Sequence, residues 1–154
     1  MRLRHLLVAL TVAFAAVVGT AGTASSAPLT KQGFTLTSDI TEEGGGTVVA
    51  SGAINATGED IVISDTEDHF VFPDGTLTII HASVRGRERF NEKKCTGGFR
   101  ETGTYVISEG TGDYEGVTGS GKYRAVGRFQ GGCAGPPTGT FTITARGSIN
   151  LPNP

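Results

Sequence analysis

The sequence predicts an all-β protein, specifically an eight-stranded antiparallel up-and-down barrel with one disulfide. Apolar and polar residues alternate with a period of two in many windows, and no window carries a sustained 3.6-residue apolar stripe. Glycine makes up 24 of the 154 residues, more than double the usual roughly 7%. So much glycine without a collagen-type period favours turns and tightly curved strands over helices.

The first 27 residues have the layout of a secretory signal. Arg2 and Arg4 give a positive start, and residues 6–18 form an uncharged apolar run. Small residues ending at Ala27 suit a signal peptidase. The apolar run is shorter than the roughly 20 residues that a membrane-spanning helix needs. We therefore expect residues 1–27 to be removed, leaving residues 28–154 as one secreted domain with no membrane association.

The two cysteines, Cys95 and Cys133, both lie in the expected mature chain. In an oxidising compartment an even cysteine count predicts a disulfide. Closing a loop of about 39 residues would stabilise the fold by roughly 4 kcal/mol in the chain-entropy view. A catalytic thiol or a metal site is the alternative, but the chain has neither a CxxC spacing nor a histidine beside either cysteine.

Strands are expected along the whole mature chain. The first six are predicted at 34–38, 47–55, 59–64, 69–73, 76–90 and 98–108. Pro73-Asp74-Gly75 predicts a tight turn, since proline presets φ and glycine accepts a positive φ. Gly44-Gly45-Gly46 is a second connector.

The last two strands, at 121–130 and 138–151, show the clearest alternation. Their expected buried faces carry Tyr123, Ala125, Gly127 and Phe129 on the first strand and Phe141, Ile143, Ala145, Ile149 and Leu151 on the second. A weak repeat places Gly103, Gly121 and Gly139 at the start of strands, 18 residues apart. An even step of strand plus turn is typical of an up-and-down meander.

About eight antiparallel strands must bury one face and protect both edges of the sheet. Closing the sheet into a barrel does both. An eight-stranded barrel holds either side chains alone or one small ligand. A two-sheet β-sandwich is the alternative architecture.

The segment 109–123, EGTGDYEGVTGSGKY, carries a family resemblance. It resembles the Gly-Thr-Gly-x-aromatic turn and glycine-rich strand start of the allene oxide cyclase and dirigent barrels, including small secreted bacterial proteins of the allene-oxide-cyclase-like type. The resemblance implies an eight-stranded barrel whose lumen binds an apolar, often unsaturated substrate. None of the family's catalytic residues can be matched onto this chain one by one.

Four polar residues are candidates for a ligand pocket: Glu88, Glu101, Tyr105 and Tyr123. The two glutamates fall on the apolar parity of their strands, Glu101 together with Phe99. A carboxylate facing the lumen would be desolvated and suited to proton transfer, and the tyrosines could donate hydrogen bonds to a bound oxygen. A β-bulge is the alternative, because one extra residue moves every later side chain to the other face.

Charge is unevenly distributed. Acidic residues without any Lys or Arg occupy 39–74, and Asp65, Glu67 and Asp68 crowd one turn that could hold Ca²⁺, although the EF-hand spacing is absent and a solvated surface is the simpler interpretation. Arg85, Arg87 and Arg89 follow on one strand face. They could bind an anion or a polysaccharide, but we favour a solubilising surface that pairs with the acidic half.

Other chemistries have little support. Ser120 lies in Gly-Ser-Gly and not in a nucleophile-elbow motif, and Gly110-x-Gly112 lacks the Lys-Ser/Thr pair of a phosphate loop. His69 and His81 have no zinc-motif spacing. We expect no metal and no cofactor, and a net charge of −2 provides no basic field for nucleic acid.

The sequence thus predicts a secreted barrel that binds a small apolar or aromatic molecule in its lumen. One alternative is a cyclase or dirigent-like isomerase that uses the same lumen to shape a reactive intermediate. A second is a surface-interaction protein with a filled barrel. A carboxylate facing an open cavity would favour the catalyst, and the oligomeric state is left open.

Overall fold

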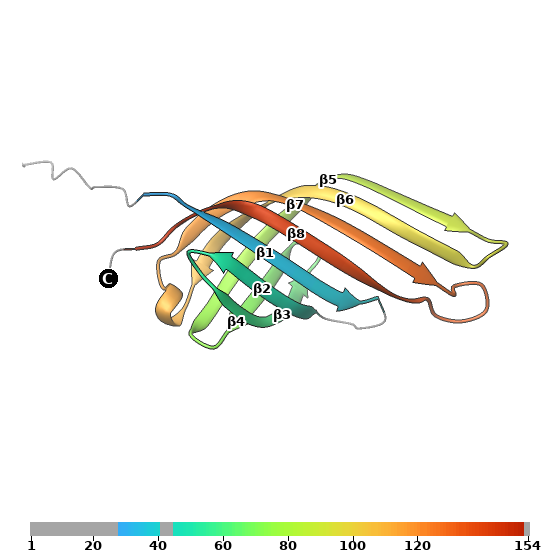
Figure 1. Cartoon of the computed structure of the whole chain (residues 1–154), viewed down its shortest axis with the longest axis horizontal. Helices are drawn as coiled ribbons and strands as arrows, with labels where there is room; N and C mark the ends of the chain where they lie inside the picture. Colours follow the sequence, from blue (N-terminus) through green and yellow to red (C-terminus); the bar gives the residue numbers. More distant parts are fainter. Residues whose placement is uncertain (1–27, 41–44, 153–154) are drawn as a thin grey trace, which may run out of the picture.

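The computed structural model describes residues 28–40 and 45–152 (Figure 1). The predicted signal, residues 1–27, lies outside the described residues. The strands are β1 (Thr30–Asp39), β2 (Gly46–Gly52), β3 (Ala56–Ser64), β4 (Glu67–Phe72), β5 (Gly75–Asn91), β6 (Thr96–Gly110), β7 (Thr118–Gln130) and β8 (Thr138–Asn150), with one 3₁₀ turn, η1 (Gly112–Tyr114), between β6 and β7.

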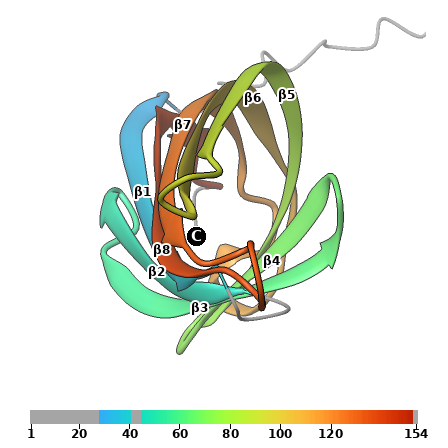
Figure 2. The ribbon, with the colours of Figure 1, turned by 90° about the vertical axis from the view of Figure 1, so that its right-hand side faces the viewer.

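The eight strands form a closed antiparallel barrel in chain order (Figure 2). Each strand pairs with the next, and β8 pairs back to β1 from Thr30↔Ile149 to Asp39↔Thr140. This closure confirms the predicted up-and-down barrel and excludes the two-sheet sandwich. The described residues include no helix long and apolar enough to cross a membrane.

The predicted alternation on the last strands is confirmed. Tyr123, Ala125 and Ala145 are buried, and Ile149 is fully buried, while the residues between them on β7 and β8 are largely exposed. The Pro73-Asp74-Gly75 turn is also confirmed, with Phe72 paired to Gly75 across it. Gly75 has φ +156° and lies so close to the Thr111 carbonyl that a Cβ there would overlap it.

The end of the barrel beside η1 is filled with side chains. Tyr114 from η1 packs edge-on against Phe72 with ring centroids 5.9 Å apart. Val117, Leu77 and Ile149 are almost completely buried in the same region. Side chains of the described residues therefore occupy the lumen at this end.

The opposite end is shaped by the two longest strands, β5 and β6, which extend beyond their neighbours (Figure 1). A disulfide between Cys95 and Cys133, with Cα atoms 5.6 Å apart, joins the β5–β6 turn to the β7–β8 loop. The amide of Gly131 also donates to the Cys95 carbonyl at 2.8 Å. The predicted disulfide is confirmed, and it holds the two longest hairpins together at their tips.

Candidate functional site

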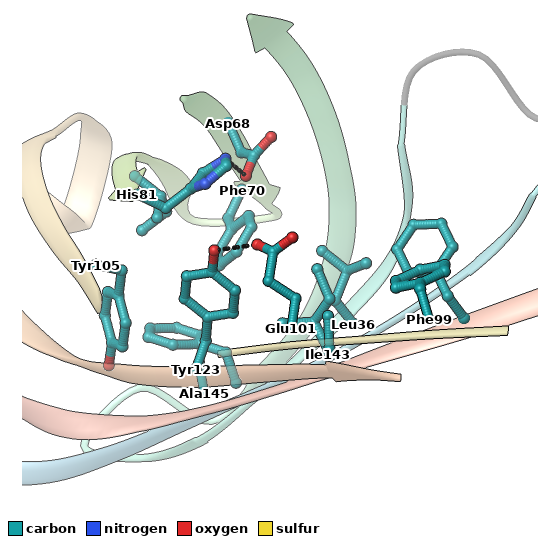
Figure 3. Close-up of a pocket in the computed structure, with 14 residues that line it drawn as sticks. Leu36, Asp68, Phe70, His81, Phe99, Glu101, Tyr105, Tyr123, Ile143 and Ala145 are labelled. Atoms are coloured by element: carbon teal, nitrogen blue, oxygen red, sulfur yellow. Dashed lines mark hydrogen bonds and ion pairs between the residues drawn. The ribbon is translucent and has the colours of Figure 1, made fainter. Parts of the chain in front are cut away.

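The half of the barrel away from η1 contains a cavity of about 180 Å³. Its wall is mainly aromatic and aliphatic, and includes Phe34, Phe70, Phe99, Phe141 and Ile143 (Figure 3). The lumen is therefore filled at one end and open at the other. An eight-stranded barrel of this kind has space for one small ligand.

Five titratable side chains stand on five consecutive strands at this end of the barrel. They are Asp60 on β3, Asp68 on β4, His81 on β5, Glu101 on β6 and Tyr123 on β7. All except Asp60 line the cavity. The barrel curvature thus brings together polar groups that are far apart in the sequence, with Asp60 and Tyr123 separated by 63 residues.

Tyr123 and Glu101 form the first pair. The Tyr123 hydroxyl donates a hydrogen bond to the Glu101 carboxylate, Oη to Oε1 2.5 Å (Figure 3). Burial raises the pKa of Tyr123, and the hydrogen bond to Glu101 and the charge of that carboxylate raise it further. Tyr123 is therefore a neutral donor, and Glu101 keeps a second oxygen for another partner.

His81 and Asp68 form the second pair. The Nε2 atom of His81 lies 3.1 Å from the Asp68 Oδ2 atom. The hydrogen bond to Asp68 raises the pKa of His81, against the opposing effect of burial. The His81 ring meets the Tyr123 ring edge-on at 6.0 Å between centroids, so the two pairs are neighbours.

Asp60 lies close to these pairs without lining the cavity. Its side chain is buried, and its Oδ1 atom has no hydrogen-bond partner among the described residues. Burial raises the pKa of Asp60 to about 7, and the charge of Asp68 adds to this increase, whereas His81 opposes it. With this pKa, both the protonated and the ionised form of the Asp60 carboxyl group are populated near neutral pH.

Two of the four predicted pocket residues, Glu101 and Tyr123, are brought into direct contact. Tyr105 also lines the cavity, and its ring packs edge-on against Phe34 at 6.1 Å. Its hydroxyl, however, points away from the Tyr123–Glu101 pair (Figure 3) and has no partner among the described residues. Burial raises the pKa of Tyr105 as well.

The structure places Glu88 outside this cavity. Ser83 pairs with Gly103 and Arg85 pairs with Thr102, so Val84 is a bulge residue without an opposite partner. After the bulge, Glu88 is opposite Phe99 and faces the inner side of the sheet, but it stands where β5 and β6 extend beyond the barrel and is exposed. Glu88 thus faces the same side of the sheet as Glu101 but does not line the cavity.

The sequence predicted a solvated acidic surface for Asp68 and no role for His81, which lacks a zinc-motif spacing. The sequence did contain a signal. Asp68 lies two and four residues before Phe70 and Phe72, and His81 lies two residues after Ile79, so each shares a strand face with apolar residues. Period-two alternation with buried neighbours places both side chains on the lumen face. Among the described residues, no group of three or more His, Cys, Asp or Glu side chains is arranged to hold a metal ion.

No known protein family, curated protein or solved structure matches this chain.

Proposed function

We propose that this chain is a secreted barrel that binds a small, mostly apolar molecule carrying one oxygen function and moves a proton on it, as an isomerase or cyclase does. The observation that carries the proposal is a carboxylate, Glu101, that accepts a hydrogen bond from Tyr123 and faces a cavity with a mainly aromatic and aliphatic wall. A half-buried carboxylate beside a bound ligand can act as a general base on it.

The cavity volume limits the size of the ligand. An apolar cavity of roughly 150 Å³ in another protein takes up benzene. The cavity of about 180 Å³ here therefore suits one ring or an aliphatic chain of similar bulk. The aromatic side chains of Phe70 and Phe99 offer such a molecule faces and edges to pack against.

The two polar pairs divide the chemistry between them. Glu101 would accept a proton from a carbon next to the ligand's oxygen function, while His81, whose pKa is raised by the hydrogen bond to Asp68, would donate a hydrogen bond to that oxygen. The electron pair of the broken C–H bond moves onto the oxygen, and Glu101 returns the proton to a different carbon. The product is an isomer of the substrate, so the reaction consumes no co-reactant.

Two further lines support this proposal. The signal-like residues 1–27 and the Cys95–Cys133 disulfide favour export to an oxidising compartment. The resemblance of residues 109–123 to the allene oxide cyclase and dirigent barrels favours an apolar, unsaturated substrate.

Binding without chemistry is the second candidate. It is favoured by the fact that each polar pair already satisfies itself, His81 with Asp68 and Tyr123 with Glu101. An apolar guest could then occupy the cavity without disturbing either pair.

Ring opening of 1,2-benzisoxazole tests the proposal. A base removes the C3 proton of this small aromatic molecule, the N–O bond breaks, and 2-cyanophenolate is released, so turnover reports a carboxylate in an apolar site. We expect the intact protein to open benzisoxazole, and Glu101→Gln to slow the reaction by about 10²-fold, which is the usual contribution of a general base. Glu88→Gln, which neutralises an exposed carboxylate outside the cavity, is the matched control and should keep the full rate.

The binding of benzisoxazole is followed separately by NMR shifts of the cavity residues. Binding with equal turnover in the intact protein and in Glu101→Gln would overturn proton transfer and establish the second candidate. No binding in the cavity would overturn both.

A further inference from the structure

The outer face of β5–β8 is a cationic surface. Residues that lie opposite one another on adjacent strands point to the same side of the sheet, so the strand register identifies the outward positions. These carry eight cations: Arg85, Arg87 and Arg89 on β5, Arg100 on β6, Lys122, Arg124 and Arg128 on β7, and Arg146 on β8. We call these eight residues the cationic face. All of them are exposed.

The acidic half of the chain does not neutralise this face. In the described part of the chain, the two ion pairs within 4 Å both involve histidine, His69 with Glu67 and His81 with Asp68. The surface pairing that the sequence suggested for Arg85, Arg87 and Arg89 is therefore not formed. The positive charge of this face remains available to a partner.

Like charges also lie directly opposite each other on this face. Arg87 pairs with Arg100 across β5 and β6, and Lys122 pairs with Arg146 across β7 and β8. Like charges at opposed positions destabilise a sheet. An anion bound between the two members of each pair would relieve this repulsion.

The face is hollowed near the hairpin tip. Arg89, Gly98 and Arg128 follow one another across β5, β6 and β7, and the central residue has no side chain. Gly98 therefore forms part of a depression that is also lined by Arg87, Arg89, Arg100 and Arg128. Four guanidinium groups around one hollow are suited to a sulfate, carboxylate or phosphate group, which arginine binds through paired N–H donors.

We propose that the cationic face binds an acidic polysaccharide. Cations that repeat every second residue along a strand, about 7 Å apart, form a lattice that a polymer with regularly spaced anionic groups can contact at several points. Threonines lie between the cations on this face. Arg124, for example, has Thr102 opposite it on β6 and Thr144 opposite it on β8, and such threonine hydroxyls can hydrogen-bond to sugar hydroxyls. The outward positions of β5–β8 carry no aromatic residue, so the face has no platform on which nucleic acid bases could stack.

This site is separate from the cavity, because the cationic face lies on the outer side of the sheet and the cavity on the inner side. The two proposals therefore succeed or fail independently.

Titration calorimetry of the whole chain with two oligosaccharides tests the proposal. A heparin hexasaccharide carries sulfate and carboxylate groups, and a hexagalacturonate carries carboxylate groups only. We expect at least one to bind with an affinity that falls as salt rises from about 50 to about 200 mM. The double variant Arg89→Thr/Arg128→Thr should weaken this binding at least about tenfold, since it removes two charge-assisted contacts at the hollow.

Lys93→Thr/Lys94→Thr is the matched control, because it removes the same charge from the β5–β6 turn outside the cationic face. It should weaken binding less than about twofold if the face is the site. Arg100→Thr is a second variant at the hollow and should also lower the affinity for the oligosaccharide. Thermal melting establishes that each variant is folded.

Three results would overturn the proposal. The first is an equal loss of affinity in the arginine and lysine variants, which would show a response to net charge alone. The second is tighter binding of duplex DNA than of either oligosaccharide at the same salt. The third is the absence of binding to both oligosaccharides at low salt.

Discussion

Gly103 lies directly opposite Tyr123 across the β6–β7 pair, and the Tyr123 ring occupies the space that a side chain on Gly103 would need. A Cβ atom on Gly103 would be 2.4 Å from Cε1 of Tyr123. The glycine thus lets the Tyr123 ring lean over β6, the strand that also carries Glu101. The position of the Tyr123 hydroxyl at the Glu101 carboxylate depends on this vacancy.

The same relationship explains the 18-residue repeat. Gly121 is opposite Tyr105, and Gly139 is opposite Phe129. Each glycine of the repeat therefore faces an aromatic residue on the adjacent strand. The large glycine content of the chain reflects in part this need for room beside the rings in a narrow barrel.

Gly103→Ala should destabilise the fold by about 1–3 kcal/mol, because the added methyl group meets both the Tyr123 ring and the Ala82 carbonyl. Gly86→Ala is the control, since a Cβ there has nothing within 4 Å. Urea unfolding measures both. Equal stability of Gly103→Ala and the unmodified protein would show that the ring can move aside freely.

Tyr123→Phe and Tyr105→Phe form a matched pair that differs in one hydrogen bond. Removing the Tyr123 hydroxyl deprives Glu101 of its donor and should cost about 1–2 kcal/mol. Removing the Tyr105 hydroxyl, which is buried without a partner among the described residues, should be neutral or stabilising. The opposite order of stabilities would mean that the Tyr105 hydroxyl has the more important partner.

Asp60→Asn should change the dependence of stability on pH. Because the pKa of Asp60 is raised from 3.8 to about 7, the folded state holds a proton that the unfolded state has released between these values. This group therefore makes the fold less stable as pH rises from about 4 to about 7. Asp60→Asn should remove that loss and be more stable at pH 8 by an amount on the order of 2–4 kcal/mol.

Unfolding free energies of the two proteins across this pH range provide the measurement. Asp39→Asn, a change at an exposed carboxylate of β1, controls for the loss of one negative charge. A difference between Asp60→Asn and the unmodified protein that stays constant with pH would contradict the assigned role of burial.

Asp68→Asn should lower the pKa of His81, because the hydrogen bond to Asp68 is the largest cause of its increase. A raised histidine pKa adds stability that is complete below about pH 6.5 and is lost as pH rises through the folded-state value. Asp68→Asn should therefore reduce stability mainly at acidic pH. NMR titration of the His81 ring protons measures the shift directly, and Glu67→Gln, which alters the partner of His69, should leave the His81 titration unchanged.

The fold could be predicted because alternation and glycine placement are local properties of the sequence. Glu101 and Tyr123 could be placed in the lumen because the β6–β7 register runs without interruption from Thr96 to Ile107. The distance of Glu88 from the cavity could not be predicted, since it depends on how far β5 and β6 extend beyond the barrel. The bulge at Val84, which shifts the alternation of the residues after it, could not be predicted either. The His81–Asp68 contact depends on the register of the β4–β5 hairpin, in which Asp68 is opposite Ile79, and the alternation within a single strand does not specify that register.

The pairing of Thr30 with Ile149 sets the outer ends of β1 and β8 side by side, at the end of the barrel that η1 fills and away from the cavity (Figure 1). A short linker could therefore join these two ends, and new ends could be opened in a loop elsewhere, to give a circular permutant with the same barrel. By the same geometry, a tag or surface tether attached at either position would leave the cavity end of the barrel unobstructed. The protein is thus suited to immobilisation for the binding measurements proposed above.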